Sequence, residues 1–260
     1  MAGGLQRATF NRADLVRILS ETVSNPIDFK YDFGERLGQW LDFTDALNLS
    51  SVLNHRSGAT TDACRHPAAA ELQAQLARAR HSLSKAISHD GAFGHEAGRH
   101  RFPTPLPDAS AASAADFSPY HRYYLAQQRE QAATLGALRS QARKALASGN
   151  PGQQQLAELD AAFEKSLQAR ERNLLANIPI LLAKRFALRY QEHCAGLGER
   201  ADDPADWSQA GSWLHAFCQD ARAVLLAELD LRLKPITGLI AALGPGDAPA
   251  PGDSPSRPAP

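Results

Sequence analysis

Apolar residues recur every three or four positions along most of the chain, and the longest such run covers residues 152–194. Its apolar positions are Leu156, Leu159, Phe163, Leu167, Leu174, Ile178, Leu181, Phe186 and Tyr190. This spacing matches one face of an α-helix, and neighbouring elements must cover such a face. Because proline lacks the N–H that continues a helix, we expect a kink at Pro179.

Two more long helices follow from the same pattern. Ser118 can cap a helix and Pro119 suits its first position, so a helix is predicted over 118–147. The turn signal SGNPG at 148–152 then returns the chain antiparallel, as in an αα-hairpin. A third helix is predicted from Trp213 to Leu243, with a break or kink at Pro235. Its pairs Glu228–Arg232 and Asp230–Lys234 are spaced for a solvated face.

Shorter amphipathic stretches predict helices in the N-terminal third at about 12–23, 32–41, 45–54 and 67–87. In the third of these we expect Thr44 to cap the helix and Leu47, Val52 and Leu53 to be buried. Trp40 and Phe43 are expected in the core, because buried aromatic side chains mostly supply packing area; a ligand platform is the alternative. In the last helix the buried stripe is Leu72, Leu76, Leu83 and Ile87.

Composition changes in two segments. Residues 89–117 are rich in Gly, His, Pro, Ser and Ala, which predicts a flexible linker, with a proline-rich docking peptide at FPTPLP as the alternative. Residues 244–260 hold no large apolar side chain and are expected to be a disordered tail. We therefore predict an all-α fold with an N-terminal helical region (1–88), a linker (89–117), a coiled-coil-like bundle of long antiparallel helices (118–243) and the tail.

Charge and cysteine content indicate which binding partners and which cellular compartment to expect. Lys+Arg and Asp+Glu number 28 each, so no global field favours nucleic acid or anionic lipid. Cys64, Cys194 and Cys218 are too few and too scattered for a disulfide framework or a C-x-x-C site. No apolar run approaches the ~20 residues that span a bilayer. We expect a soluble cytoplasmic protein without a membrane span.

Metal and catalytic sites have little support in the pattern. The strongest metal candidates are His89, His95, Glu96 and His100, but the two histidines of HEAGRH are one residue too far apart to share a helix face. A solvated linker is the favoured interpretation. No phosphate-binding glycine loop or nucleophile motif occurs, and Cys194 and Cys218 are expected to be structural thiols. We expect no metal, no cofactor and no small-molecule substrate.

Candidate contact residues lie on the long helices. Three tyrosines open the 118–147 helix, Tyr120, Tyr123 and Tyr124, and they suit either core packing or a partner-binding patch. Basic residues cluster twice, at Arg139, Arg143 and Lys144, and at Lys184, Arg185 and Arg189. A basic helical stripe can bind phosphates, but a solvated face, or one facing acidic residues of a partner, is favoured because acids balance bases overall.

Several blocks, in this order, resemble an uncharacterised family of proteobacterial proteins known as a domain of unknown function: LVRIL (15–19), RLGQWLDFTDALNLSSVLN (36–54), YHRYYLAQQRE (120–130), ARERNLLANIPILLAKRF (169–186) and LLAELDLRLKPITGLIAAL (225–243). The resemblance covers nearly the whole chain apart from the linker and the tail. It supplies no activity, cofactor or catalytic residue. It implies a cytoplasmic accessory of a membrane-associated assembly.

The function that fits these observations best is a non-enzymatic helical scaffold or adaptor that acts through an unidentified protein partner. A nucleic-acid-binding helical protein and an enzyme of unrecognised class are the alternatives. The sequence fixes neither the oligomeric state nor whether the N-terminal helices pack on the bundle.

If the 152–194 stripe is core, Phe163→Ala should lower the free energy of unfolding by about 3–5 kcal/mol, as truncation of a buried phenylalanine does. Thermal or denaturant unfolding measures this loss. An unchanged unfolding midpoint would mean that Phe163 is not buried.

Overall fold

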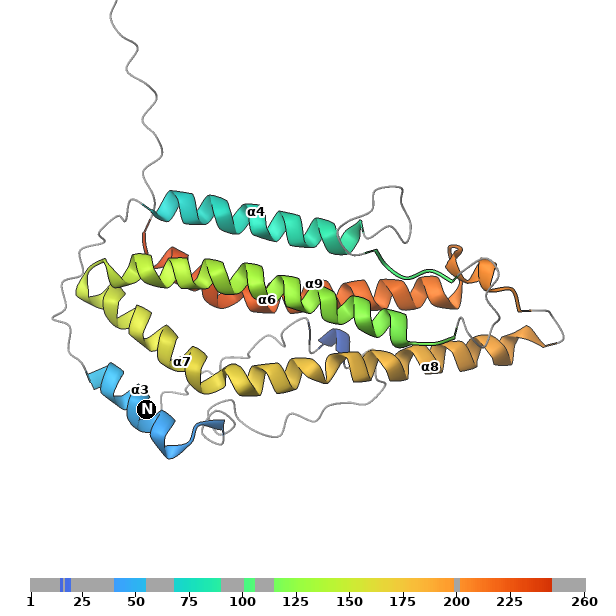
Figure 1. Cartoon of the computed structure of the whole chain (residues 1–260), viewed down its shortest axis with the longest axis horizontal. Coiled ribbons are helices and arrows are strands. Elements are labelled where there is room, and N and C mark those ends of the chain that lie inside the picture. The colour runs from blue at the N-terminus through green and yellow to red at the C-terminus, as the bar shows by residue number, and fades with distance from the viewer. Residues whose placement is uncertain are drawn as a thin grey trace, which may run out of the picture. The chain divides into compact units, whose positions relative to one another are not determined.

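The computed structural model describes residues 15, 17–19, 40–54, 68–89, 101–105, 115–198 and 202–244, except the side chains at 205 and 208. In these residues the regular structure is helical, without a strand (Figure 1). The bounded elements are α3 (Phe43–Asn54), α4 (Ala69–Ser88), α6 (Ser118–Ala147), α7 (Pro151–Ala176), α8 (Ile178–Leu197), the 3-10 helix η1 (Pro204–Ser208) and α9 (Trp213–Ala241). The predicted all-α helical bundle is confirmed.

The helices group into two compact units, which are described separately. Unit 1 takes in the described residues of Met1–Phe29, Ser84–Gln128 and Ala176–Leu231. Unit 2 takes in those of Lys30–Leu83, Arg129–Leu175 and Arg232–Pro260. Of the helix predicted at 12–23 the structure describes residues 15 and 17–19, which are helical, and of the helix predicted at 32–41 it describes residues 40 and 41. The predicted tail lies outside the described residues apart from Gly244, and the domain boundaries drawn from the sequence stay a prediction.

Unit 2 contains the turn end of the predicted αα-hairpin, formed by α6 from Arg129 onward and by α7 up to Leu175 (Figure 1). Residues 148–150 form the turn, and the side chains of Asn150 and Gln153 cap α7 reciprocally. Asn150 Oδ1 accepts the Gln153 N–H at 2.9 Å, and Gln153 Oε1 accepts the Asn150 N–H at 3.0 Å. Gln153 Nε2 also donates to the Ala242 carbonyl at 3.0 Å, which ties the end of α9 to the hairpin.

Helix α3 also belongs to unit 2, and it contacts α7 near both of its ends. Gln155 of α7 donates to the Val52 carbonyl at 3.1 Å, and Ser166 donates to Asp45 Oδ1 at 2.6 Å. The N-cap is Asp42, not the predicted Thr44, because Asp42 Oδ1 accepts the Asp45 N–H at 2.7 Å. These contacts show that α3, at least, packs on the long helices.

The burial predicted for α3 is wrong. Leu49 is its buried residue, whereas Phe43, Leu47 and Leu53 are 80%, 54% and 60% exposed. Val52 and Trp40 are half-buried. A helical spacing of apolar residues does not determine which side of the helix faces the protein, and here α7 covers only one side of α3.

The 152–194 stripe is divided between two helices, because α7 ends at Ala176 and α8 begins at Ile178. The interruption expected at Pro179 is present, and Pro179 occupies the first turn of α8. In α8, Ile178, Leu182 and Phe186 are buried. In α7, the residues Leu156, Leu159, Phe163 and Leu167 are only half-buried, and Leu174 is 54% exposed.

The core of unit 1 is aromatic and joins three helices. The Phe186 ring of α8 lies 5.1 Å from the rings of Tyr120 in α6 and of Phe217 and Trp213 in α9. Helix α9 is buried over much of its surface; its fully covered residues here include Leu214, Val224 and Leu225, each 0–1% exposed.

The stripe predicted for α4 is confirmed, since Leu72, Leu76, Leu83 and Ile87 are all buried.

Phe102 departs from the prediction of a flexible linker over 89–117. It is 1% exposed, with its ring 4.9 Å from that of Tyr123 and 5.5 Å from that of Tyr120. The Arg222 guanidinium lies 5.9 Å from its ring centre. A single phenylalanine among prolines has enough apolar surface to be buried against neighbouring rings, which average composition does not reveal.

Three side-chain truncations should lower the free energy of unfolding by different amounts, because the three side chains differ in burial. Leu225→Ala should cost about 2–5 kcal/mol of unfolding free energy, because Leu225 is fully buried. Leu174→Ala should cost less than about 1 kcal/mol, because Leu174 is largely exposed. Phe163→Ala should fall between them, below the loss expected from the sequence. Urea unfolding of the three variants measures the order, and an equal loss for Leu174→Ala and Leu225→Ala would contradict it.

Candidate functional site

The three candidate tyrosines are interior residues. Tyr120, Tyr123 and Tyr124 are 5%, 6% and 2% exposed, so they form no partner-binding patch in this structure, and core packing is the better interpretation. Burial raises the pKa of the Tyr120 hydroxyl above its ordinary value, so the hydroxyl remains protonated at neutral pH. Their density at the start of α6 reflects the aromatic core of unit 1.

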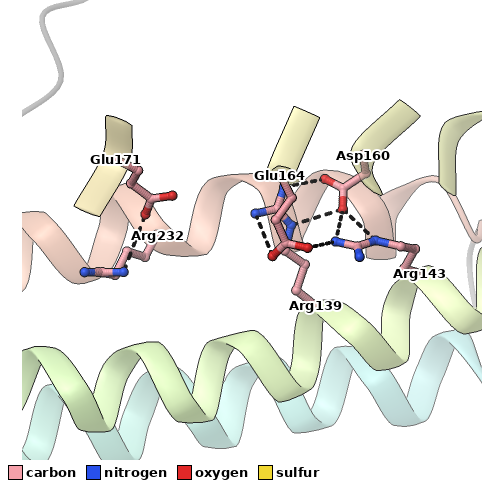
Figure 2. Close-up of polar contacts among 6 residues, drawn as sticks. All are labelled: Arg139, Arg143, Asp160, Glu164, Glu171 and Arg232. Atoms are coloured by element: carbon pink, nitrogen blue, oxygen red, sulfur yellow. Dashed lines mark hydrogen bonds and ion pairs between the residues drawn. The ribbon is translucent and has the colours of Figure 1, made fainter. Parts of the chain in front are cut away.

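The first basic cluster is neutralised inside the α6–α7 hairpin (Figure 2). Arg139 donates from Nη2 to Asp160 Oδ1 at 2.6 Å, and Arg143 donates from Nη2 to Asp160 Oδ2 at 2.7 Å. Glu164 adds a contact of 2.5 Å to Arg143 Nη2. These four residues are called the hairpin network below. Lys144, the third member of the basic cluster, is exposed.

The Asp160 carboxyl group is the centre of the hairpin network. Burial by itself would raise its pKa, but the hydrogen bonds and charges of Arg139 and Arg143 outweigh this effect and hold the pKa below its ordinary value. Its side chain is 10% exposed, and those of the two arginines are 17% and 23% exposed. Two guanidinium groups on a shielded carboxylate make a stronger link than a surface ion pair.

The second basic cluster, in unit 1, is neutralised in the same way. Arg185 Nε and Arg189 Nη2 lie 3.0 Å and 2.9 Å from Asp220 Oδ2 of α9. Lys184 is exposed. Arginines that already form an ion pair with a carboxylate inside the protein are poor phosphate ligands, since binding a phosphate would require breaking that ion pair. The four arginines of the two clusters therefore serve helix packing and only Lys144 and Lys184 of these clusters are exposed, which weakens the nucleic-acid interpretation.

A further polar contact links α7 to α9 within unit 2. Arg232 Nη1 lies 3.5 Å from Glu171 Oε1, whose side chain is 51% exposed (Figure 2). The long distance and the exposure of Glu171 make this the weakest ion pair drawn there. Arg232 thus contacts α7, a partner that the i,i+4 spacing to Glu228 did not predict.

Glu228 is the largest departure from the sequence analysis among the charged residues. It was expected on a solvated face, but it is 0% exposed. Its carboxyl oxygens accept hydrogen bonds from Tyr124 Oη at 3.0 Å and from Gln128 Nε2 at 3.0 and 3.2 Å. Only the burial of α9 on several sides reveals this site, because a glutamate four residues from an arginine is typical of a solvated helix.

The second polar site missed by the sequence analysis joins α8 to η1 in unit 1. Asp202 Oδ1 lies 2.8 Å from His193 Nε2 and accepts the Trp207 indole N–H at 2.7 Å. Trp207 is 1% exposed and packs on Trp213, with ring centres 4.9 Å apart. Asp202 thus satisfies the buried indole of Trp207 and fixes the turn that leads into α9.

The thiols and the metal candidates offer no assembled chemistry in the described residues. Cys218 is buried and Cys194 is exposed. Nowhere in the described ranges do three or more His, Cys, Asp or Glu residues gather as metal ligands. His89 is exposed at the end of α4. His95, Glu96 and His100 lie outside the described residues, and their interpretation as part of a solvated linker stays a prediction.

The exposed side of α3 is the best candidate for contact with another molecule. Phe43, Leu47 and Leu53 are called the α3 face below. Helix α3 contains no Lys, Arg or Glu, and its one acidic residue, Asp45, accepts a hydrogen bond from Ser166 of α7. Depletion of charge around exposed aromatic and aliphatic side chains is typical of the centre of a protein interface.

Comparison with known proteins decides the family. The profile described as "Protein of unknown function (DUF3348)" matches residues 1–245 of the 260. The chain belongs to the DUF3348 family. This confirms the resemblance to a domain of unknown function that covers nearly the whole chain. Neither the curated proteins nor the solved structures gave a match.

Membership of the DUF3348 family assigns no activity, so the site residues of this protein stand on their geometry. None of the described helices is both long and apolar enough to cross a membrane. Among the described helices, α3 exposes three large apolar side chains, whereas α7 exposes Leu174 and α8 exposes Ile180 and Leu188. The hairpin network, Asp202 and Glu228 act within the protein.

The hairpin network predicts a pH dependence of stability. Because the folded-state pKa of Asp160 lies below its unfolded value of roughly 3.9, the network stabilises the protein above that value. Its contribution is lost as pH falls through the folded-state pKa. Asp160→Asn should cost about 1–3 kcal/mol at pH 7 and progressively less as the pH falls below about 4.

Chemical unfolding of both proteins across this pH range measures the difference. Glu171→Gln is the control, and it should change stability by less than about 0.5 kcal/mol, because its ion pair is long and exposed. A difference between wild type and Asp160→Asn that stays constant down to pH 2 would contradict the proposed role of Asp160.

Proposed function

We propose that this protein is a non-enzymatic helical scaffold or adaptor that binds another protein through the α3 face. The observation that carries the proposal is the outward presentation of Phe43, Leu47 and Leu53 on a helix without Lys, Arg or Glu. Burying one such side chain in a partner contributes about 1.5–3 kcal/mol. Phe43, with 80% of its surface exposed, has the most to gain.

The way in which α3 is held supports a rigid docking element. Contacts from Gln155 and Ser166 fix the helix near both ends, and Leu49 packs inward. A helix already formed and anchored loses less entropy on binding than a segment that must fold first. An amphipathic helix or an apolar groove on the partner would be complementary to this uncharged surface.

The pairing of charges inside the protein supports protein rather than nucleic acid as the partner. Asp160, Glu164 and Asp220 form ion pairs with four arginines from the two basic clusters. The α3 face itself offers no cation for a phosphate backbone. We further propose that the partner belongs to a membrane-associated assembly and that the protein serves it from the cytoplasm, as the family resemblance implied.

Affinity capture from the native host tests the proposal. The bait is the full chain, and the variant Leu47→Glu places a charge in the α3 face. Leu174→Glu is a matched control, because Leu174 of α7 has the same 54% exposure as Leu47. Wild type and Leu174→Glu should retain a common set of proteins, and Leu47→Glu should lose at least one of them while its Tm stays within a few degrees.

Purified partner, once identified, should bind Leu47→Glu at least tenfold more weakly than wild type in a titration, since tenfold corresponds to about 1.4 kcal/mol. Equal affinity of the two proteins for every captured partner would refute a role for the α3 face. Detection of an enzymatic activity that wild type and Leu47→Glu share would instead favour the alternative that the protein is an enzyme.

A further inference from the structure

The buried contact between α6 and α9 in unit 1 contains a polar layer, defined here as Tyr124, Gln128 and Glu228. Tyr124 is 2% exposed and Glu228 is 0% exposed, while Gln128 is part-buried. The three side chains are joined by hydrogen bonds of 3.0–3.2 Å that all end on the Glu228 carboxyl group. The two donors lie four residues apart on α6, so one turn of that helix faces one residue of α9.

The residues around this layer are apolar on α9 and mixed on α6, where Gln127 and Gln131 are also buried. On α9 the neighbours of Glu228 along the chain include Val224, Leu225 and Leu229, each 0–1% exposed. On α6 the preceding turn holds Tyr120 and Tyr123, which are also buried. Helices that meet through apolar side chains alone can shift along one another at little cost, because such contacts are not directional. Hydrogen bonds to a buried carboxyl group are directional and fix one alignment.

A buried charged or polar group is seldom the most stable solution. Replacement of a buried polar network by apolar side chains of similar volume is often neutral or stabilising, whereas removal of one partner is destabilising. The best-attested use of such a group in a helical interface is to select one register over others. Glu228 therefore occupies a position where leucine would suit stability and glutamate suits specificity.

We infer that the polar layer selects the alignment of α6 against α9 and that it does so at a cost in stability. This inference is independent of the proposed function. Moving α6 by one turn in one direction would place Ala132 where Gln128 now donates, and alanine has no donor. Glu228 would then be buried with fewer hydrogen bonds, which disfavours that alignment.

Gln131 supplies a matched control on the same helix. It is 0% exposed, and among the described residues neither atom of its side-chain amide has a hydrogen-bond partner. Gln128→Leu and Gln131→Leu are the same chemical change, three residues apart, and only the first removes a donor to Glu228. Gln128→Leu and Tyr124→Phe should each lower the Tm by roughly 3–10 °C. Gln131→Leu should leave the Tm unchanged or raise it.

The decisive variant replaces the whole layer, as Tyr124→Phe/Gln128→Leu/Glu228→Leu in the full chain. Its Tm should equal or exceed that of wild type, while its amide NMR spectrum should show doubled or broadened peaks from residues of α6 and α9. Size-exclusion chromatography distinguishes alternative alignments within one chain from exchange of helices between chains.

Three results would contradict the inference. A triple variant with one sharp set of amide peaks would show that the apolar contacts alone fix the alignment. A triple variant less stable than both Tyr124→Phe and Gln128→Leu would show that the layer contributes net stability instead of reducing it. Equal Tm values for Gln128→Leu and Gln131→Leu would likewise remove Gln128 from the layer.

Discussion

Burial of α9 is the constraint on which the rest of the structure depends. A helix covered on one side needs a single apolar stripe, but a helix covered on several sides needs apolar residues around most of its circumference. The sequence of α9 meets this demand from Trp213 to Ile240, with buried residues on successive turns and at neighbouring positions such as Val224 and Leu225. In unit 1, Phe186 of α8 and Tyr120 of α6 complete the aromatic core against it.

Burial of this kind also explains how the charges are used. Equal numbers of acidic and basic residues allow most shielded charges to find a partner on a neighbouring helix. Asp160 holds two arginines in the hairpin, and Asp220 holds two more between α8 and α9. Each of these carboxylates accepts from arginines one turn apart, so a single acidic residue fixes the position of a full turn of the facing helix.

The α3 face and the polar layer depart in opposite ways from the usual rule that apolar side chains are buried and ionisable side chains are exposed. Leu47 is apolar and exposed, whereas Glu228 is ionisable and buried. Each departs from the pattern expected of its residue type, and such departures are retained where they serve recognition or specificity rather than stability. The proposed role as a scaffold would require both properties, because a scaffold must hold one internal arrangement of helices and also present an apolar surface for binding.

Local sequence determined the helices, because capping residues, prolines and the 3.6-residue period act within a few positions. It placed the hairpin at 148–152, the interruption near Pro179 and the stripe of α4 correctly, and it pointed to the family. The period also named Leu47 and Phe163 as core residues, and aromatic character named Phe43; Leu47 and Phe43 are exposed, and Phe163 is only half-buried. An amphipathic stripe shows that a helix has an apolar side, but not whether the protein or the solvent lies against it.

Tertiary packing decided the rest. The partners of Asp160, Asp202 and Glu228 lie on other helices or across a turn, so no spacing along one helix could pair them. The average composition of residues 89–117 did not predict that Phe102 is buried, although a single ring is enough to fill a gap in an aromatic core. Sequence alone thus set which segments are helical, since that depends on local interactions. Which side of each helix is buried, and which charges meet, depends on distant segments and emerged only once the helices had packed.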